Sequence, residues 1–405
     1  MDSDYLLAGG RLVLPEAVLD GGALLVEKGR IARIYAAGEP LPAGPARIDA
    51  KGAWVTPGLM ELHIHGAGGV GFEALGLGAS KRAGAGAGPD EMDRPGEPER
   101  TGYAEAAARD LEGVAVFLEA RGVTAFLPTL VAEPGSVERL ALALETAAFP
   151  AHRVPGIYVE GPFVNPARRG GIPQEFLREA SPGILDSYLQ AARGRLKVMA
   201  YAPELPGADS LPGRLAGEGV LPALGHSDAV LGRFEPPAGA YSLTHHFNAM
   251  SPFSHKEPGL AMLPFLDPRP SVELVSDGVH VNDEALRICA AAFAPGRVLL
   301  VSDACAAAGL PDGEYEYFGR RIVSGERGVR YADSGVLMGS RRLGPELLRN
   351  WLRAAGRPVH EAVLALTRNP RRLVGVVDRG SIEPGQAAEL VVWEGEFESP
   401  RLVLR

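Results

Sequence analysis

The stretch Thr56-Pro57-Gly58-Leu59-Met60-Glu61-Leu62-His63-Ile64-His65-Gly66 is an apolar run that ends in two histidines separated by one residue. Alternate side chains of a strand point to the same face, so His63 and His65 project together while Ile64 points to the other side. Two imidazoles on one face form half of a metal site. A surface or packed pair of histidines is the alternative, and the rest of the chain favours the metal site.

Length and charge limit the classes of protein to which the chain can belong. Its 405 residues fit one large α/β barrel with a small accessory domain. The net charge of −9 at pH 7 argues against a nucleic-acid partner, which would usually require a basic face. The first residues are acidic where a secretory signal is positive, and no run approaches the length of a membrane span. We therefore expect a cytoplasmic protein with no membrane partner.

The two ends of the chain share a pattern of short strands and tight turns. Residues 24–34 predict a hairpin with glycine in its turn, and residues 380–393 predict a turn that leads into an apolar strand. We expect residues 1–55 and 375–405 to form one small β-sandwich domain beside a catalytic domain of residues 56–374.

Eight apolar, strand-like runs lie between these ends, and helix-compatible segments separate most of them. They end near His65, Thr129, Glu160, Pro203, His226, His245, Asp277 to His280, and Asp303. Alternating strands and helices in this number predict an α/β fold, a (β/α)8 TIM-like barrel with its active site at the C-terminal ends of the strands. Most of the histidines fall at those ends.

Residues 76–102 interrupt the first β-to-α connection and are rich in Gly, Ala, Pro and charge. Such a segment buries too little apolar surface to fix its own conformation, so we expect a mobile surface loop. It starts beside the metal end of the barrel, which makes a lid the second interpretation, although the composition favours plain disorder.

A histidine-rich pocket is predicted because seven of the nine histidines lie at strand ends or in the following loops. Glu160, which precedes a Gly-Pro turn, adds a carboxylate that can bridge two cations. Imidazoles with one or two carboxylates suit Zn²⁺ or Fe²⁺. Of the adjacent His245 and His246, only one can face inward on a regular strand; we choose His245, and the sequence leaves His246 open. The predicted ligands are His63, His65, Glu160, His226 and His245.

Asp303 is the candidate base, because it follows the eighth strand-like run in Val301-Ser302-Asp303-Ala304. Beside a metal-bound water, its carboxylate could accept a proton as the water attacks a carbonyl, and then return the proton to the leaving group. No serine elbow or cysteine nucleophile motif competes with this interpretation.

These residues resemble the N-acetylglucosamine-6-phosphate deacetylases of the amidohydrolase superfamily, over most of the chain. Beyond the ligands, the resemblance is carried by Pro57-Gly58, Gly66 to Val70, Leu127-Pro128-Thr129, Glu160 to Phe163, Gly225-His226-Ser227, Thr244 to Met250, Lys256 to Gly259, Asp277 to His280, and Asp303-Ala304. It implies a homodimer that hydrolyses the acetamide of N-acetylglucosamine 6-phosphate to acetate and glucosamine 6-phosphate.

The resemblance also implies roles for the metal ligands. Glu160, His226 and His245 would hold one divalent cation, with Asp303 as general base and later general acid. Some family members lack the H-x-H pair and use one metal. The pair in this chain implies that a second ion, bridged by Glu160, is possible.

The resemblance places His280 on the sugar, and Asn248 and the backbone N–H of Ala249 on the phosphate. At the position of Lys256 the family usually has an arginine that reaches the phosphate across a dimer interface. Arginine binds phosphate bidentately whereas lysine offers a point charge, so this departure weakens the phosphate prediction.

Two further departures concern the choice of sugar. Ile172 stands where the family often has a polar residue that binds substrate, and Gln174 is a possible replacement. Arg341 and Arg342 follow a Gly-Ser pair where the family has small and apolar residues, and solvent-facing arginines are the simpler interpretation.

Other functions stay open at this point. A related N-acyl amino sugar, the galacto epimer or an unphosphorylated one, is one alternative. Cyclic-amide amidohydrolases are another, but they commonly use a carboxylated lysine near the end of the fourth strand, whereas Lys197 lies at its beginning. A non-catalytic barrel that binds a sugar phosphate or a metal would have no need of Asp303 as a base.

Overall fold

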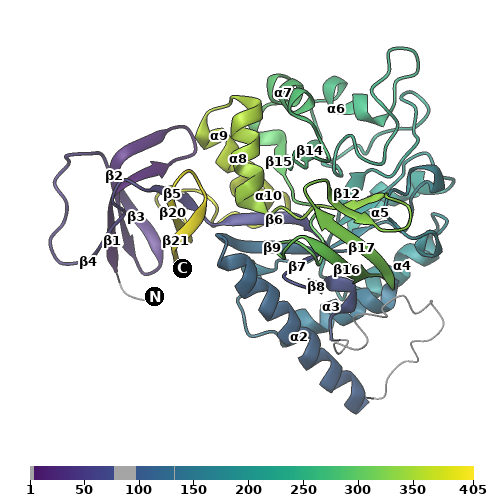
Figure 1. Cartoon of the computed structure of the whole chain (residues 1–405), viewed down its shortest axis with the longest axis horizontal. Helices are drawn as coiled ribbons and strands as arrows, with labels where there is room; N and C mark the ends of the chain where they lie inside the picture. Colours follow the sequence, from purple (N-terminus) through teal and green to yellow (C-terminus); the bar gives the residue numbers. More distant parts are fainter. Residues whose placement is uncertain (1–3, 77–96, 132) are drawn as a thin grey trace.

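A sheet of eight parallel strands forms the centre of the structure, a computed structural model that describes residues 4–76, 97–131 and 133–405 (Figure 1). In sheet order the strands are β6 (Leu59–Ile64), β9 (Val123–Leu130), β10 (Ile157–Glu160), β11 (Leu196–Tyr201), β12 (Leu221–Leu224), β13 (Ser242–Leu243), β14 (Ser271–Leu274) and β15 (Val298–Leu300). A parallel bridge between Ile64 and Ala304 joins the end of the first strand to the segment after the last. The sheet is thereby nearly closed, which confirms the predicted TIM-like barrel.

The barrel strands are continuous apolar runs because both of their faces are covered. Every residue of β6 and β9 is buried. A cluster of buried side chains joins strands from around the barrel and fills its interior, and it includes Met60, Leu127, Tyr158, Ala200, Ala223 and Val301. This packed interior supports the residues at the C-terminal strand ends from below.

Helices cover the outside of the barrel. They are α2 (Glu97–Glu119), α3 (Pro134–Thr146), α4 (Pro182–Ala191), α5 (Leu211–Gly217), α6 (Leu263–Leu266), α7 (Asp283–Ala292), α8 (Gly344–Ala355), α9 (Val359–Leu364) and α10 (Arg368–Leu373). α8 buries Leu347, Leu348 and Trp351, whose spacing places them on one helical face, and it contacts β6 and β15. Among the described residues, no helix combines the length and apolarity needed to cross a membrane.

The two chain ends form a separate sheet domain, as predicted, at one side of the barrel (Figure 1). Its seven strands form one hydrogen-bonded sheet of β1 (Tyr5–Val13), β2 (Val18–Glu27), β3 (Arg30–Tyr35), β4 (Ala46–Asp49), β5 (Trp54–Pro57), β20 (Leu390–Glu394) and β21 (Ser399–Leu404). A core of its own contains Leu7, Leu24, Val55 and Leu390. The expected hairpin at 24–34 lies in β2 and β3, and the residue bounds of the two domains stay predictions.

A four-stranded antiparallel sheet between β15 and α8 was not predicted. It consists of β16 (Gly313–Tyr317), β17 (Arg320–Gly325), β18 (Gly328–Tyr331) and β19 (Leu337–Gly339). A smaller ribbon of β7 (Gly66–Ala67) and β8 (Val70–Gly71) follows β6 directly. Both stand at the C-terminal end of the barrel, beside the candidate site.

Most of the mobile loop expected at residues 76–102 lies outside the described residues, which omit 77–96. The last part of that range, residues 97–102, is helical and begins α2. The helix therefore starts earlier than the sequence composition indicated.

Candidate active site

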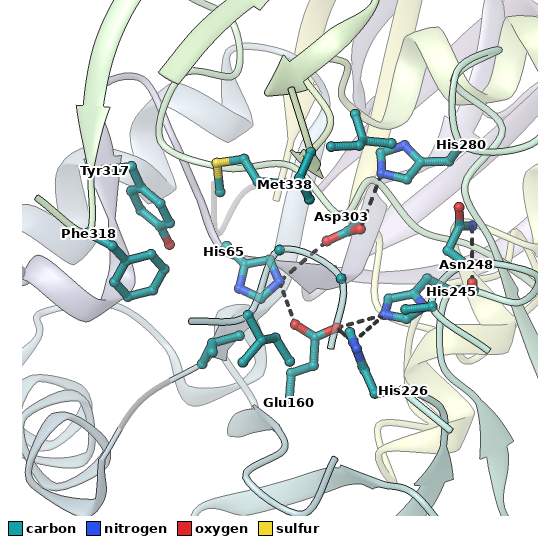
Figure 2. Close-up of a pocket in the computed structure, with 17 residues that line it drawn as sticks. His65, Glu160, His226, His245, Asn248, His280, Asp303, Tyr317, Phe318 and Met338 are labelled. Atoms are coloured by element: carbon teal, nitrogen blue, oxygen red, sulfur yellow. Dashed lines mark hydrogen bonds and ion pairs between the residues drawn. The ribbon is translucent and has the colours of Figure 1, made fainter. Parts of the chain in front are cut away.

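A cavity of about 250 Å³ opens at the C-terminal ends of the barrel strands (Figure 2). It is lined by His65, Val131, Glu160, Gly170, Gly171, Ile172, His226, His245, Asn248, Ala249, His280, Asp303, Tyr317, Phe318, Val336, Leu337 and Met338. Eight of the ten predicted site residues therefore line the cavity. His63 is fully buried next to His65, and Lys256 is the exception described below.

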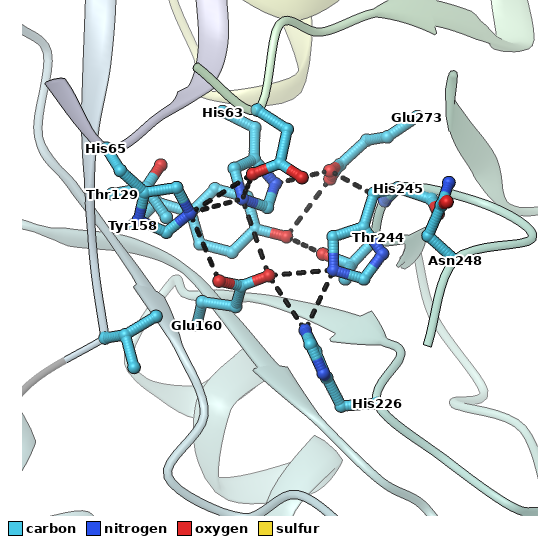
Figure 3. Close-up of polar contacts among 12 residues, drawn as sticks. His63, His65, Thr129, Tyr158, Glu160, His226, Thr244, His245, Asn248 and Glu273 are labelled. Atoms are coloured by element: carbon cyan, nitrogen blue, oxygen red, sulfur yellow. Dashed lines mark hydrogen bonds and ion pairs between the residues drawn. The ribbon is translucent and has the colours of Figure 1, made fainter. Parts of the chain in front are cut away.

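Glu160 brings two of the histidines together at the end of β10 (Figure 3). Its Oε1 lies 2.9 Å from Nε2 of His226 and 2.8 Å from Nε2 of His245, and these two nitrogens are 2.8 Å apart. Both histidines follow short strands and have positive φ angles, 48° and 26°, which are uncommon for residues other than glycine. Such backbone conformations cluster at functional sites, where the surrounding structure maintains them.

His63, His65 and Asp303 form a second group on the other side of Glu160. His63 is fully buried, and its Nε2 lies 3.3 Å from Nε2 of His65 and 3.6 Å from Oε1 of Glu160. Nε2 of His65 lies 3.2 Å from Oε2 of Glu160 and 3.3 Å from Oδ1 of Asp303. Oε2 of Glu160 thus faces His65, and Oε1 faces the first group and also lies near His63, so the carboxylate stands between the two groups.

The donor atoms fit a divalent cation by their chemistry and spacing. In each group they lie within 4.8 Å of one another and belong to buried residues. An ion with ligand distances of about 2.0–2.2 Å spans such a group, and imidazole with carboxylate is a donor set used by zinc and iron. The lone pairs of two imidazole nitrogens at 2.8 Å also repel each other unless a proton or a cation lies between them.

The charges of the cluster support this conclusion. Burial raises the pKa of Glu160, but the neighbouring imidazoles, above all that of His226, outweigh it and hold this pKa well below the usual range. Burial lowers the pKa of His245, but the carboxylate of Glu160 outweighs it and raises the pKa to about 9. Glu160 is therefore an anion, and its charge favours protonation of the neighbouring imidazoles. A bound cation would supply this positive charge in place of the protons.

Asp303 occupies the position expected of a base. Its Oδ2 lies 3.5 Å from Nε2 of His280, and its backbone N–H donates to the carbonyl of His63 at 3.0 Å. Burial raises its pKa, but the contact with His65 and the charges of the other histidines outweigh burial and lower it to about 2. The carboxylate is therefore ionised at neutral pH and able to accept a proton.

The substrate-binding residues expected near the cations divide into two sets. His280, Asn248 and Ala249 line the cavity. Nδ1 of His280 lies 2.8 Å from Asp277, which leaves Nε2 facing Asp303, and the amide of Asn248 donates to the carbonyl of His245 at 3.1 Å. Lys256 does not line the cavity; it lies in an exposed loop between β13 and η6 (Leu260–Met262).

The adjacent histidines of the pair 245–246 point in different directions. His245 faces the cavity, whereas His246 packs against Phe247, Phe265 and Phe293. Neither ring nitrogen of His246 has a hydrogen-bond partner among the described residues, and burial with the charge of His245 lowers its pKa to about 3. His246 is therefore a neutral ring in an apolar layer behind the site.

At the positions that depart from the family pattern, the described residues add no lysine or arginine to the cavity. Ile172 lines the cavity, whereas Gln174 is exposed and does not. Arg341 forms an ion pair with Asp312, and neither Arg341 nor Arg342 lines the cavity. Among the residues that the structure describes, no lysine or arginine belongs to the cavity lining.

Several residues around the site were not predicted. Glu273 and Tyr158 lie within strands β14 and β10, where the apolar runs were interpreted as barrel core. A charged residue in the middle of a buried strand was the available signal for Glu273. Tyr317 and Met338 come from the unpredicted sheet, and Phe318 follows its first strand. Tyr317 and Phe318 lie on the side of the cavity away from Asn248 and His280 (Figure 2).

Comparisons with known proteins find relatives over nearly the whole chain. No family model matches the chain. It is 32% identical to an N-acetylgalactosamine-6-phosphate deacetylase of Escherichia coli O157:H7, over 96% of this chain and 94% of that protein. It is 30% identical to an N-acetylglucosamine-6-phosphate deacetylase of Bos taurus, over 96% of this chain and 87% of that protein, and 27% identical to one of Bacillus subtilis (strain 168), over 98% and 95%.

Solved structures of deacetylases also resemble the chain over almost its full length. An N-acetyl-D-glucosamine-6-phosphate deacetylase variant from Mycobacterium smegmatis, in complex with N-acetyl-D-glucosamine 6-phosphate, superimposes with a TM-score of 0.81 and 26% identity, over 100% of this chain and 98% of that chain. An N-acetylglucosamine-6-phosphate deacetylase from Pasteurella multocida shares the fold with a TM-score of 0.81 at 23% identity, over 98% of this chain and 97% of that chain.

Proposed function

We propose that this chain, which belongs to the N-acetylglucosamine-6-phosphate deacetylase family of the amidohydrolase superfamily, hydrolyses the acetamide of an N-acetylated amino sugar 6-phosphate. The products are acetate and the free amino sugar phosphate. One observation supports this most strongly: an ionised, buried carboxylate, that of Asp303, lies beside two converging groups of cation ligands. A binding protein would gain nothing from a base in that position.

Glu160, His226 and His245 would hold one divalent cation, and His63, His65 and Asp303 are placed to hold a second. When bound, such a cation acidifies water and polarises the carbonyl oxygen of the acetamide. Zinc or iron as the cation, the number of ions per chain and a cytoplasmic location stay predictions.

Asp303 moves the proton in the proposed reaction. Its carboxylate accepts a proton from the attacking water and then donates it to the sugar nitrogen as the C–N bond breaks, so that one water is consumed for each acetate and amine released. His280 lies 3.5 Å from Oδ2 of Asp303 and is held by Asp277, so it marks the side of the carboxylate that faces the sugar.

Asn248 and Ala249, which both line the cavity, are the proposed phosphate contacts. Asn248 lies on the side of the cavity away from Tyr317 and Phe318 (Figure 2). A phosphate carries about two negative charges, and the cavity lining contributes no lysine or arginine in the described residues. We therefore propose a homodimer in which Lys256, exposed on its loop, reaches the phosphate in the partner subunit.

The galacto epimer is the second candidate substrate. The 32% identity to an N-acetylgalactosamine-6-phosphate deacetylase, over 96% of the chain, favours it alongside the gluco epimer. A cyclic-amide substrate is not favoured, because Lys197 lies at the beginning of β11 and thus at the opposite end of the barrel from the ligands.

The test is acetate release from a panel of substrates by purified protein supplied with Zn²⁺ or Fe²⁺. The panel contains N-acetylglucosamine 6-phosphate, N-acetylgalactosamine 6-phosphate, unphosphorylated N-acetylglucosamine and dihydrouracil. We expect at least one of the 6-phosphates to be hydrolysed with the highest kcat/KM, and we expect Asp303→Asn to abolish most of that activity. Hydrolysis confined to dihydrouracil, or no hydrolysis of any compound, would overturn the proposal.

A further inference from the structure

Glu273 is a fully buried carboxylate in β14 that touches both groups of candidate ligands (Figure 3). Its Oε2 lies 3.0 Å from Nδ1 of His63, on the side of the ring away from the cavity. The same oxygen accepts the backbone N–H of His245 at 3.4 Å. One side chain thus contacts the imidazole of His63 and the main chain of His245, which belong to different groups.

The orientation of this carboxylate is fixed by further partners. Its Oε1 accepts the hydroxyl of Tyr158 at 3.2 Å and that of Ser242 at 3.3 Å. The ring of Tyr158 also packs against the imidazole of His63, with ring centroids 4.7 Å apart. Both oxygens of Glu273 therefore act as hydrogen-bond acceptors. The side chain of Glu273 cannot turn without breaking several of these hydrogen bonds.

An acceptor beside Nδ1 determines which nitrogen of His63 carries the proton. With the proton on Nδ1, the ring donates to Glu273, and Nε2 keeps its lone pair. That lone pair then points at the second group, where Nε2 lies 3.3 Å from His65 and 3.7 Å from Oδ1 of Asp303. With the proton on Nε2 instead, His63 would have no lone pair to offer a cation.

We propose that Glu273 is a positioning residue: it fixes the tautomer and orientation of His63, and so enables the group of His63, His65 and Asp303 to hold a second cation. Buried carboxylates behind metal-ligating histidines commonly act in this way. This proposal depends on the proposed function in one respect, namely that the site binds cations. Hydrolysis with a single cation in the group of Glu160 remains possible without it.

Two substitutions of Glu273 distinguish the loss of both acceptor oxygens from the retention of one. Glu273→Met keeps the size of the side chain but removes both acceptor oxygens. Glu273→Gln keeps one amide oxygen, which can accept a hydrogen bond from His63. Its NH₂ group then faces the hydroxyls of Tyr158 and Ser242. Ser242→Ala is the matched control, because it removes one partner of Oε1 and leaves the contact between Glu273 and His63 in place.

The measurement is calorimetric titration of stripped protein with Zn²⁺, together with metal analysis after dialysis. We expect two sites per wild-type chain. Glu273→Met should weaken the site of His63 by about 10–100-fold, the usual effect of losing such a partner. It should weaken the other site less, because there only the contact with the backbone N–H of His245 is lost. Glu273→Gln should weaken the site of His63 less, Ser242→Ala should match the wild type, and His65→Ala should reproduce the loss seen with Glu273→Met.

The hydrogen bond from His63 to Glu273 is a second readout. In zinc-saturated protein with ¹⁵N-labelled histidine, the Nδ1–H signal of His63, assigned with His63→Gln, should lie downfield because it donates to Glu273, and Glu273→Met should move it upfield. Two unweakened sites in Glu273→Met, equal weakening of both sites, or an Nδ1–H signal of His63 that Glu273→Met leaves unchanged would overturn the proposal. A wild type that binds one cation but releases acetate would overturn it while leaving the proposed function intact.

Discussion

The Nε2 atoms of His226 and His245 lie 2.8 Å apart, and both face the same oxygen of Glu160. Each nitrogen is delivered by a residue just beyond a strand end, from β12 and β13, with positive φ. The protein therefore holds two imidazoles in a conformation that costs free energy, of order 1–3 kcal/mol for each strained residue. Coordination of a shared cation, as proposed above, would explain this arrangement.

Asp303→Asn should lower kcat and leave binding of the cation by the group of Glu160 unchanged. The amide side chain has nearly the same shape but cannot accept the proton, and loss of a general base usually costs about 10²- to 10⁴-fold in rate. Acetate release and metal content of the same preparation check this expectation. A variant with more than a tenth of the wild-type kcat would show that Asp303 is not the base.

The neighbouring His245 and His246 provide a matched pair of substitutions. His245→Phe should remove one ligand and lower both the metal content and acetate release. His246→Phe should retain both, because the ring of His246 already packs among phenylalanines and its nitrogens have no partners among the described residues. Removing such unpaired polar atoms is close to neutral or stabilising, so its thermal midpoint should not fall. The reverse pattern would assign the ligand to His246.

Lys256 should matter only for phosphorylated substrates if it binds the phosphate. Lys256→Ala is expected to raise KM for the 6-phosphate by about 10–100-fold, given roughly 1.5–3 kcal/mol for a hydrogen bond to a charged group. It should leave kcat/KM for the unphosphorylated sugar unchanged, and Lys256→Arg should preserve binding.

The control for Lys256 is Lys28→Ala, which removes the same charge from an exposed position in the sheet domain. The two variants are compared by steady-state kinetics on the 6-phosphate and on the unphosphorylated sugar. Sedimentation measures the oligomeric state of each variant. Equal losses on both sugars, or no loss on the 6-phosphate, would refute the proposed role of Lys256.

The junction between the barrel and the sheet domain predicts a dependence of stability on pH. Glu389, next to β20, forms a buried ion pair with Arg371 of α10 and also contacts Arg379 at 3.3 Å. Burial raises the pKa of Glu389, but Arg371 and the other partners outweigh burial and lower it. Its contribution to stability is therefore fully present above about pH 4.5 and is lost as the pH falls through the lowered pKa.

Glu389→Gln should accordingly destabilise the protein by about 3–5 kcal/mol at pH 7, because the charge of Arg371 is left buried without its partner. The difference from the wild type should shrink as the pH is lowered from 5 to 3. Thermal unfolding across this range measures it. Glu394→Gln, an exposed change at the other end of β20, should stay within about 0.5 kcal/mol. A constant difference at all pH values would exclude the ionised pair as its source.

Much of the fold was predictable because barrel strands are buried on both faces and appear in the sequence as apolar runs. The runs ending near His65, Thr129 and Glu160 correspond to β6, β9 and β10. The sheet of β16–β19 was missed because β16 and β17 alternate between exposed and less exposed residues outside the barrel. Such strands lack the continuous apolar signal.

The candidate site was predictable where polar residues follow apolar runs, and less so where the backbone departs from a regular strand. β13 has two residues and ends at Leu243, so His245 and His246 lie beyond it. The alternation of side chains along a regular strand therefore does not determine which of them faces the cavity. In the structure His245 faces it, with a positive φ that no regular strand has. Glu273 was not foreseen because it lies within the apolar run of β14, which was interpreted as barrel core, and not after its end.

The most direct test of the account is acetate release from N-acetylglucosamine 6-phosphate and its galacto epimer by stripped protein titrated with Zn²⁺ or Fe²⁺, with wild type and Glu160→Gln side by side. The wild type should be inactive when stripped and should regain activity in proportion to the first bound cation. Glu160→Gln should stay at least about 100-fold less active at the same cation concentration, since even partners behind a ligand account for 10–100-fold. Full activity in stripped wild type, or full recovery in Glu160→Gln, would contradict the account.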